Sequence, residues 1–186
     1  MERSPVNLPN ALTLLRIVLV PALVVFLVQR RFEAALGVFL IAGVSDALDG
    51  FIARRFDLCT RLGAILDPLA DKLLIVLSCL VLAWIGHIPW WLAVVIVARD
   101  LVIVAGAGAY YLRAGHLEMA PSIYSKANTC VQIVLVLVVI AHGARVLPVD
   151  PLLVPLFVLA LATALVSGGH YVVVWGQRAA ASSRKA

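Results

Sequence analysis

Long apolar runs separated by short polar breaks dominate the sequence. Six segments are each mostly apolar and close to the roughly 20 residues that a helix needs to cross the hydrocarbon core of a bilayer. They are residues 12–28, 34–50, 67–85, 88–112, 127–144 and 152–175. None alternates with period two, and hydrocarbon offers no water to an unpaired backbone group, so helices are expected rather than strands. The pattern predicts an all-α integral membrane protein, a bundle of six transmembrane helices.

The basic residues of the connections predict the orientation of this bundle, because cytoplasmic loops carry an excess of Lys and Arg. With a cytoplasmic N-terminus, three basic residues fall on the outer side, namely Arg30, Arg31 and Arg145. Nine fall on the cytoplasmic side: Arg3, Arg54, Arg55, Arg61, Arg113, Lys126, Arg178, Arg184 and Lys185. We therefore predict that both termini are cytoplasmic, although Arg30 and Arg31 locally oppose this assignment.

The composition supports a membrane protein with a single domain. Of the 186 residues, 63% are hydrophobic and 13% charged, and the mean hydropathy is +1.07. A water-soluble domain carries about 25% charged residues. The net charge of +5 is explained by topology and does not require a nucleic-acid partner, and three cysteines without a C-x-x-C motif provide no disulfide framework. We expect one membrane domain over residues 1–176 and a loose basic tail over 177–186.

Four aspartates lie inside or at the ends of apolar segments, where each carboxylate costs about 2.5–3.5 kcal/mol. Asp46 and Asp49 are three residues apart, and Asp67 and Asp71 are four apart, so each pair shares one helix face. The short connection between the pairs makes the two helix ends antiparallel neighbours. Two divalent cations would cancel the four charges, and a set of oxygen ligands favours Mg²⁺ or Mn²⁺ over Zn²⁺.

Residues around the aspartates indicate phosphate chemistry. Gly50 and Gly63 remove side chains where a substrate must come close, and Arg54 can hold a phosphate through two parallel hydrogen bonds. Together with two metals at a membrane surface, these residues favour phosphoryl transfer to or from a lipid-linked substrate. Two alternatives stay open: helix-end aspartates paired with neighbouring basic residues, and an ion-coupled membrane carrier. Carriers usually have internal repeats, and none is visible here.

The same residues resemble a known family. Residues 46–71 fit D-x2-D-G-x2-A-R-x8-G-x3-D-x3-D at every fixed position, which is the signature of the CDP-alcohol phosphatidyltransferases. Residues 8–17, 98–100 and 121–132 resemble the branch that contains phosphatidylglycerophosphate and cardiolipin synthases. Phosphatidylglycerophosphate synthases typically have the patterns A-R-E and G-K-x-K-T, from which Asp100, Ser125 and Asn128 depart. These three residues are closer to the R-D and S-K-x-N-T-x-x-Q patterns of the cardiolipin synthases. The resemblance covers residues 8–132, about two-thirds of the chain.

The resemblance implies a six-helix membrane enzyme, commonly a homodimer, that uses CDP-diacylglycerol. It implies that an acceptor hydroxyl attacks the phosphorus attached to diacylglycerol and that CMP leaves. It makes Asp46, Asp49, Asp67 and Asp71 the ligands of two Mg²⁺ or Mn²⁺ ions, with Asp71 also the base. The expected CDP-binding residues are Gly50, Ala53, Arg54, Gly63, Asn10 and Thr13. For the last two, helix capping is the alternative role.

Arg99 and Lys126 are the candidates for binding a phosphate on the acceptor. Arg99 lies deep in an apolar segment, where an unpaired guanidinium is costly, so its alternative role is an ion pair within the bundle. Adjacent residues of a helix do not face each other, so we do not expect Asp100 to be its partner.

Taken together, the residues predict divalent-metal-dependent phosphatidyl transfer to a glycerol-type acceptor. Phosphatidylglycerol is favoured, which would give cardiolipin, and glycerol 3-phosphate is the main alternative. We expect a multi-pass protein of a bacterial cytoplasmic membrane with its active site facing the cytoplasm.

Overall fold

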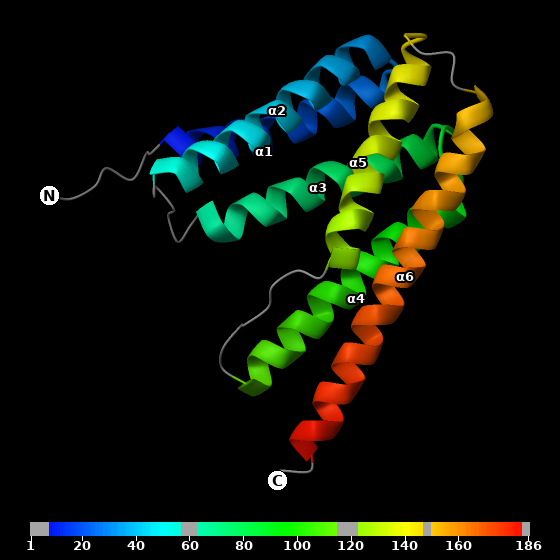
Figure 1. Ribbon diagram of the computed structural model, residues 1–186. Coiled ribbons are helices and arrows are strands. Elements are labelled where there is room, and N and C mark those ends of the chain that lie inside the picture. The colour runs from blue at the N-terminus through cyan, green and yellow to red at the C-terminus, as the bar shows by residue number, and fades with distance from the viewer. Residues whose placement is uncertain (1–7, 57–62, 115–122, 147–149, 184–186) are drawn as a thin grey trace, which may run out of the picture. The chain divides into compact units, whose positions relative to one another are not determined.

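The structure is a computed structural model, and it describes residues 8–56, 63–114, 123–146 and 150–183. Side chains are described for residues 18–45, 72–106, 123–146 and 150–174, and for Leu15 and Leu48. Within these ranges the chain is all-α and forms six helices (Figure 1). They are α1 (Leu8–Val28), α2 (Phe32–Phe56), α3 (Gly63–Trp84), α4 (Trp90–Ala114), α5 (Ile123–Gly143) and α6 (Asp150–Ser183). The predicted order of six helices is therefore confirmed.

Local sequence explains several of the helix boundaries. Pro89 immediately precedes α4, and Pro151 occupies the first turn of α6, where the missing N–H of proline leaves no hydrogen bond unmade. The tail was expected to be loose from residue 177, but α6 continues to Ser183. The alanines at 179–181 explain this difference, because alanine has the highest intrinsic helix propensity.

The helices form two compact units. Unit 1 comprises Met1–His87 and Val136–Val149, and in it α1 packs against both α2 and α3 (Figure 1). Its buried side chains include Leu23, Leu27 and Leu82. Helices α2 and α3, which carry the aspartates of the signature, are therefore held by the same partner helix.

Unit 2 comprises Ile88–Leu135 and Asp150–Ala186, and in it α4 packs against α6. The buried side chains Leu92, Ile96 and Ala160 belong to its core, and helix α5 contributes residues to both units. Unit 2 also buries several polar side chains, which form the candidate site described below.

Much of the apolar surface of the described helices is exposed. On α6, for example, Val154, Val158 and Leu165 are each more than half exposed. Ile123–Gly143 and Asp150–Val174 are long and apolar enough to cross a membrane, and three shorter apolar stretches lie within α1, α2 and α3. The six-span topology and the orientation of the termini stay predictions.

Three helices of unit 1 end in the same hydrogen-bonded turn. After α1, the N–H groups of Arg30 and Arg31 donate to the carbonyls of Leu27 and Phe26 at 2.9 and 2.8 Å. This is a Schellman motif, in which the residue after the helix adopts a left-handed conformation and is usually glycine. Gly86 fills that position after α3, with φ of 85°.

Arginine takes the same left-handed position after the other two helices. Arg30 has φ of 56° and Arg145, after α5, has φ of 58°. The N–H groups of Arg145 and Val146 donate to the carbonyls of His142 and Ala141 at 2.9 and 3.0 Å. A side chain in this conformation costs about 1 kcal/mol that glycine would not. The chain thus accepts local strain at two arginines.

Gly143 allows the end of α5 to approach α2 closely. A Cβ atom on Gly143 would lie 2.6 Å from Cδ1 and 2.7 Å from Cγ of the Phe32 ring. Phe32 is buried and its ring lies 4.7 Å from that of His87, so it has little room to shift. We therefore expect Gly143→Ala to lower the free energy of unfolding by about 1–3 kcal/mol, because overpacking forces the neighbours apart.

Thermal unfolding of the detergent-purified protein, followed by tryptophan fluorescence, measures this effect. Gly169→Ala is the matched control, because a Cβ atom there would meet no neighbour within 4 Å. An equal unfolding midpoint for Gly143→Ala and wild type would contradict the tight contact.

Candidate functional site

The signature residues lie on two helices of unit 1, α2 and α3. Asp46 and Asp49 belong to the last three turns of α2, and Asp67 and Asp71 to the first three turns of α3. Because both segments are α-helical, each pair shares a helix face, as the spacing predicts. The side chains of all four lie outside the described ones. Among the side chains that are described, no three of His, Cys, Asp and Glu gather as a metal site. Convergence of the four carboxylates on two metals therefore stays a prediction.

The expected CDP-binding residues lie on these two helices and on α1. They are Asn10 and Thr13 on α1, Gly50, Ala53 and Arg54 on α2, and Gly63 at the start of α3. Their side-chain environments also lie outside the described part of the chain. The fold therefore places all of them in unit 1 with the aspartates, while their contacts with a nucleotide stay predicted.

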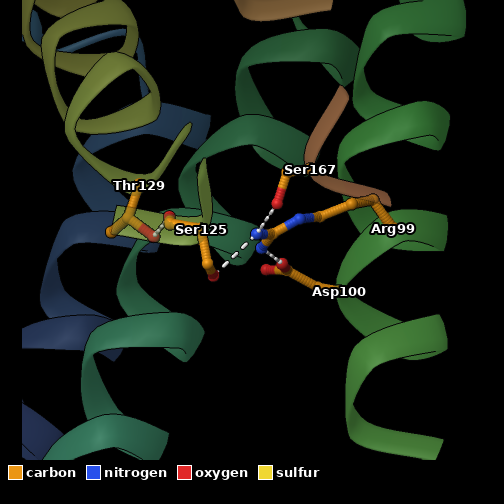
Figure 2. Close-up of polar contacts among 5 residues, drawn as sticks. All are labelled: Arg99, Asp100, Ser125, Thr129 and Ser167. Atoms are coloured by element: carbon orange, nitrogen blue, oxygen red, sulfur yellow. Dashed lines mark hydrogen bonds and ion pairs between the residues drawn. The ribbon is translucent and has the colours of Figure 1, made fainter. Parts of the chain in front are cut away.

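A polar cluster centred on Arg99 is described in atomic detail in unit 2 (Figure 2). Arg99 lies on α4 and is only 5% exposed. Its Nη2 donates to Oγ of Ser125 on α5 at 2.8 Å and to Oγ of Ser167 on α6 at 2.5 Å. Thr129, one turn after Ser125, donates to the Ser125 carbonyl at 3.1 Å. A single guanidinium thus joins three helices.

The partner of Arg99 differs from the prediction. Nη1 of Arg99 forms an ion pair with Oδ1 of Asp100 at 2.5 Å, and Asp100 is 7% exposed. The expectation that these adjacent residues would not pair was wrong. The spacing rule describes the directions in which side chains leave the helix. Figure 2 shows the long Arg99 side chain and the Asp100 side chain both extending from α4, so that their charged ends meet.

Ser167 is a member of this cluster that the sequence did not single out. It is fully buried on α6, in an otherwise apolar stretch, and Gly168 follows it. A Cβ atom on Gly168 would lie 3.5 Å from Cγ of Arg99, so the arginine stem lies directly against this part of α6. The signal available in the sequence was a serine beside two glycines within an apolar helix.

Two further buried polar side chains lie on the same stripe of α5 as Ser125. Asn128 and Gln132 follow it by three and seven residues, and they are 0% and 1% exposed. Among the described residues, neither amide atom of Asn128 has a hydrogen-bond partner, nor does Nε2 of Gln132 or Nε of Arg99. Buried polar atoms are rarely left without partners, so these four atoms mark positions where water or another polar group can bind.

Lys126, the second candidate for acceptor binding, is exposed and is not part of the Arg99 cluster. It follows Ser125 directly on α5, so its side chain leaves the helix in another direction. The structure therefore separates the two candidates, and Arg99 is the buried one.

Most of the unpaired atoms on Arg99, Asn128 and Gln132 are hydrogen-bond donors. Nε of Arg99, Nδ2 of Asn128 and Nε2 of Gln132 are all hydrogen-bond donors, and Oδ1 of Asn128 is an acceptor. The positive charge of Arg99 is already balanced by Asp100. Donors of this kind suit oxygen acceptors, phosphate oxygens among them.

Known proteins resemble this chain over most of its length. The human cardiolipin synthase (CMP-forming) is 36% identical over 154 residues, which cover 73% of this chain and 50% of the human protein. The rat cardiolipin synthase (CMP-forming) is 37% identical over 72% of this chain and 49% of its own length. The chain thus spans about half the length of these two relatives.

A bacterial relative is similar over nearly its whole length. The CDP-diacylglycerol–glycerol-3-phosphate 3-phosphatidyltransferase of Bacillus subtilis is 33% identical over 185 residues, which cover 89% of this chain and 93% of that protein. Residues 6–175 match the family described as CDP-alcohol phosphatidyltransferase, and this range contains the signature, α1 to α5 and most of α6. The chain belongs to the CDP-alcohol phosphatidyltransferase family.

Proposed function

We propose that this protein is a membrane enzyme that transfers the phosphatidyl group of CDP-diacylglycerol to the hydroxyl of a glycerol-type acceptor and releases CMP. The observation that carries the proposal is the complete signature of residues 46–71, within a family match over residues 6–175. Its fixed positions lie on two helices that pack against the same partner, α1. We take residues 1–176 as the catalytic domain.

In the proposed reaction, Asp71 takes the proton of the acceptor hydroxyl. The acceptor oxygen then attacks the phosphorus that carries diacylglycerol, a new P–O bond forms, and the bond between that phosphorus and the CMP oxygen breaks. Arg54 holds the diphosphate with its planar fork of N–H donors, and Gly50, Ala53 and Gly63 leave room for the cytidine. Asn10 and Thr13 complete the nucleotide side of the site.

The donor set of the signature suits two divalent cations. Asp46, Asp49, Asp67 and Asp71 offer only carboxylate oxygens, which hard cations such as Mg²⁺ and Mn²⁺ prefer. When bound, two such ions neutralise the phosphates and acidify the attacking hydroxyl. Without them, four carboxylates near one another would repel both the diphosphate and each other.

Removal of divalent ions is therefore expected to abolish CMP release. Addition of Mg²⁺ or Mn²⁺ to the EDTA-treated protein should restore the rate. Ca²⁺ or Zn²⁺ should not, because Ca²⁺ is larger than Mg²⁺ and Zn²⁺ prefers nitrogen and sulfur ligands. CMP release from purified protein, measured by chromatography after dialysis against EDTA, tests this. Undiminished turnover in EDTA would contradict the two-metal proposal.

The buried cluster of unit 2 supports an acceptor that carries a phosphate. Arg99 and the unpaired donors of Asn128 and Gln132 fit the oxygens of a phosphodiester or a phosphate monoester. Lys126 is proposed to attract the acceptor from its exposed position on α5. Phosphatidylglycerol is the favoured acceptor, because Asp100, Ser125 and Asn128 resemble the cardiolipin synthases, and the product would be cardiolipin.

Glycerol 3-phosphate is the second candidate, favoured by the similarity to the Bacillus subtilis enzyme over nearly its full length. One assay separates the two. Purified protein is incubated with CDP-diacylglycerol, Mg²⁺ and each acceptor in turn, and the lipid product is identified by mass spectrometry. Cardiolipin identifies phosphatidylglycerol as the acceptor, phosphatidylglycerophosphate identifies glycerol 3-phosphate, and the absence of CMP with every acceptor would favour an ion-coupled carrier.

The proposed setting is a bacterial cytoplasmic membrane, crossed six times, with the active site facing the cytoplasm and the enzyme acting as a homodimer. Exposed apolar side chains on the described helices support a lipid environment. The distribution of nine basic residues against three supports this orientation.

A further inference from the structure

A pocket of about 360 Å³ opens in unit 1 where α1 and α5 end and α2 begins. Three arginines, Arg30, Arg31 and Arg145, line it together with Glu33, which leaves a formal charge of +2. Phe32 and Ala34, on the first turn of α2, line it too, and the N-terminal end of a helix favours anions. Arg30 and Arg145 lie 115 positions apart in sequence, so only folding brings their charges together.

This pocket is distinct from the proposed active site. Glu33 and Asp46 lie on the same helix, α2, and are separated by 13 residues, which correspond to about 20 Å along the helix axis. The pocket therefore lies near the opposite end of the helix from the signature. Arg30, Arg31 and Arg145 are also the three basic residues that the topology count placed on the outer side.

The positive charge of the pocket comes from these arginines, and within the described part of the chain none of them forms an ion pair. All three are exposed. His87 contacts Phe32 of the pocket lining, with the two rings tilted by 46°. Burial lowers the pKa of His87 below its ordinary value of 6.5, and Arg30 and His142 lower it further against a backbone hydrogen bond. This shift favours the neutral imidazole, so the charge of the pocket comes from the arginines and Glu33.

Helix capping alone does not explain these arginines. A cation at the end of a helix interacts favourably with the helix dipole, and this applies to Arg30 and Arg145. Both, however, occupy the left-handed position that Gly86 fills after α3, where a side chain is strained. Two strained arginines that line one pocket indicate that their side chains have a function that glycine could not provide.

We propose that this pocket binds the phosphate of an anionic phospholipid from the surrounding bilayer, at a site separate from catalysis. Three guanidinium groups at the surface of a helical bundle match a lipid phosphate, which accepts several charge-assisted hydrogen bonds at once. The exposed apolar side chains of Val25 and Val28 on the last turns of α1 provide a surface for the acyl chains. The inference does not depend on the proposed reaction.

The test uses the full chain, purified in an uncharged detergent and stripped of lipid, without CDP-diacylglycerol or metal. Phosphatidic acid is the probe, because it presents a phosphate but has no head-group alcohol to serve as acceptor. Native mass spectrometry gives its dissociation constant, with phosphatidylcholine of the same acyl chains and inorganic phosphate as comparison ligands. We expect wild type to bind phosphatidic acid at least tenfold more tightly than phosphatidylcholine.

The decisive variant is Arg30→Gly with Arg145→Gly. It removes two guanidinium groups and relieves the strain at both left-handed positions. The unfolding midpoint without lipid should therefore be equal to that of wild type or higher, while the affinity for phosphatidic acid should fall about tenfold or more. Arg31→Gln, which leaves both turns intact, should weaken binding about threefold or more. The control Arg184→Ser with Lys185→Ser removes two positive charges elsewhere and should leave binding within twofold of wild type.

Three results would overturn the proposal. The first is wild-type affinity for phosphatidic acid in both the double glycine variant and Arg31→Gln. The second is an equal loss in the Arg184→Ser, Lys185→Ser control, which would assign the effect to net charge. The third is displacement of the lipid by inorganic phosphate at matching concentration, which would make the pocket a site for soluble phosphate. Loss of CMP release in other experiments would leave these results unaffected.

Discussion

Replacing Asp71 by asparagine is expected to lower the rate of CMP release by about 10³-fold or more. The change removes the proposed base, which alone contributes about 10²–10⁴-fold in enzymes. It also replaces one carboxylate of the metal-binding set by a neutral amide, so the site would hold its ions less tightly. The measurement is the initial rate of CMP release by purified variant and wild type at saturating CDP-diacylglycerol and Mg²⁺.

Asp150→Asn is the matched control for this substitution. Asp150 lies in the first turn of α6, where asparagine also caps a helix well, so this variant should keep the wild-type rate. Unfolding midpoints of both variants should stay within a few degrees of wild type, since Asp71 lies near the start of α3. A wild-type rate for a folded Asp71→Asn protein would refute the assignment of the base.

Replacing Arg99 by methionine should destabilise the protein more than Gly143→Ala does. It would leave the Asp100 carboxylate buried without its cation, and breaking a buried ion pair in this way costs about 3–5 kcal/mol. The hydroxyls of Ser125 and Ser167 would also lose their shared donor. We expect the unfolding midpoint to fall by roughly 10 °C.

The double variant Arg99→Met with Asp100→Leu separates stability from function. Replacing both members of a buried ion pair by apolar residues is often neutral, so most of the lost stability should return. If Arg99 binds the acceptor phosphate, the double variant should still show a KM for the acceptor raised about tenfold or more, with the KM for CDP-diacylglycerol little changed. Full recovery of acceptor turnover would instead assign a purely structural role to Arg99.

Ser167→Ala provides a graded comparison in the same cluster. It removes one of the two hydroxyls on Nη2 of Arg99 and should cost about 1 kcal/mol, because Ser125 still accepts a hydrogen bond. Its effect on the acceptor KM should be smaller than that of the double variant. Comparison of Ser167→Ala with the double variant therefore tests whether the KM for the acceptor rises as Arg99 loses its hydrogen-bond partners or is itself removed.

Local rules predicted the helices well because helix formation here depends on short-range patterns. Apolar runs close to 20 residues can satisfy their backbone groups only within themselves in lipid, and the structure has helices in all six places. The end of α6 was not predicted, because the basic residues of the tail favour a loose segment while its alanines favour a helix, and the alanines prevail as far as Ser183. The spacing of the aspartates within each pair also follows directly from the helical period.

Side-chain partners were harder to predict because they depend on packing between helices. Ser167 meets Arg99 across 68 positions of sequence, and no local pattern pairs them. Asp100 meets Arg99 across one position, because the long arginine side chain brings its guanidinium to the neighbouring carboxylate within a buried environment. In both cases the partner of Arg99 depends on which polar atoms the packed helices bury together.

The sequence by itself determined that this protein is all-α, that it has six helices and that it carries the family signature. Each of these is encoded in spacing along one helix or in a fixed motif. Only the tertiary structure decided that Arg99 is held by Asp100, Ser125 and Ser167, and that Arg30, Arg31 and Arg145 line one pocket. The physical reason is that the helical period is a local property of the backbone. The environment of a charge, by contrast, depends on which distant segments exclude water from it or leave it exposed.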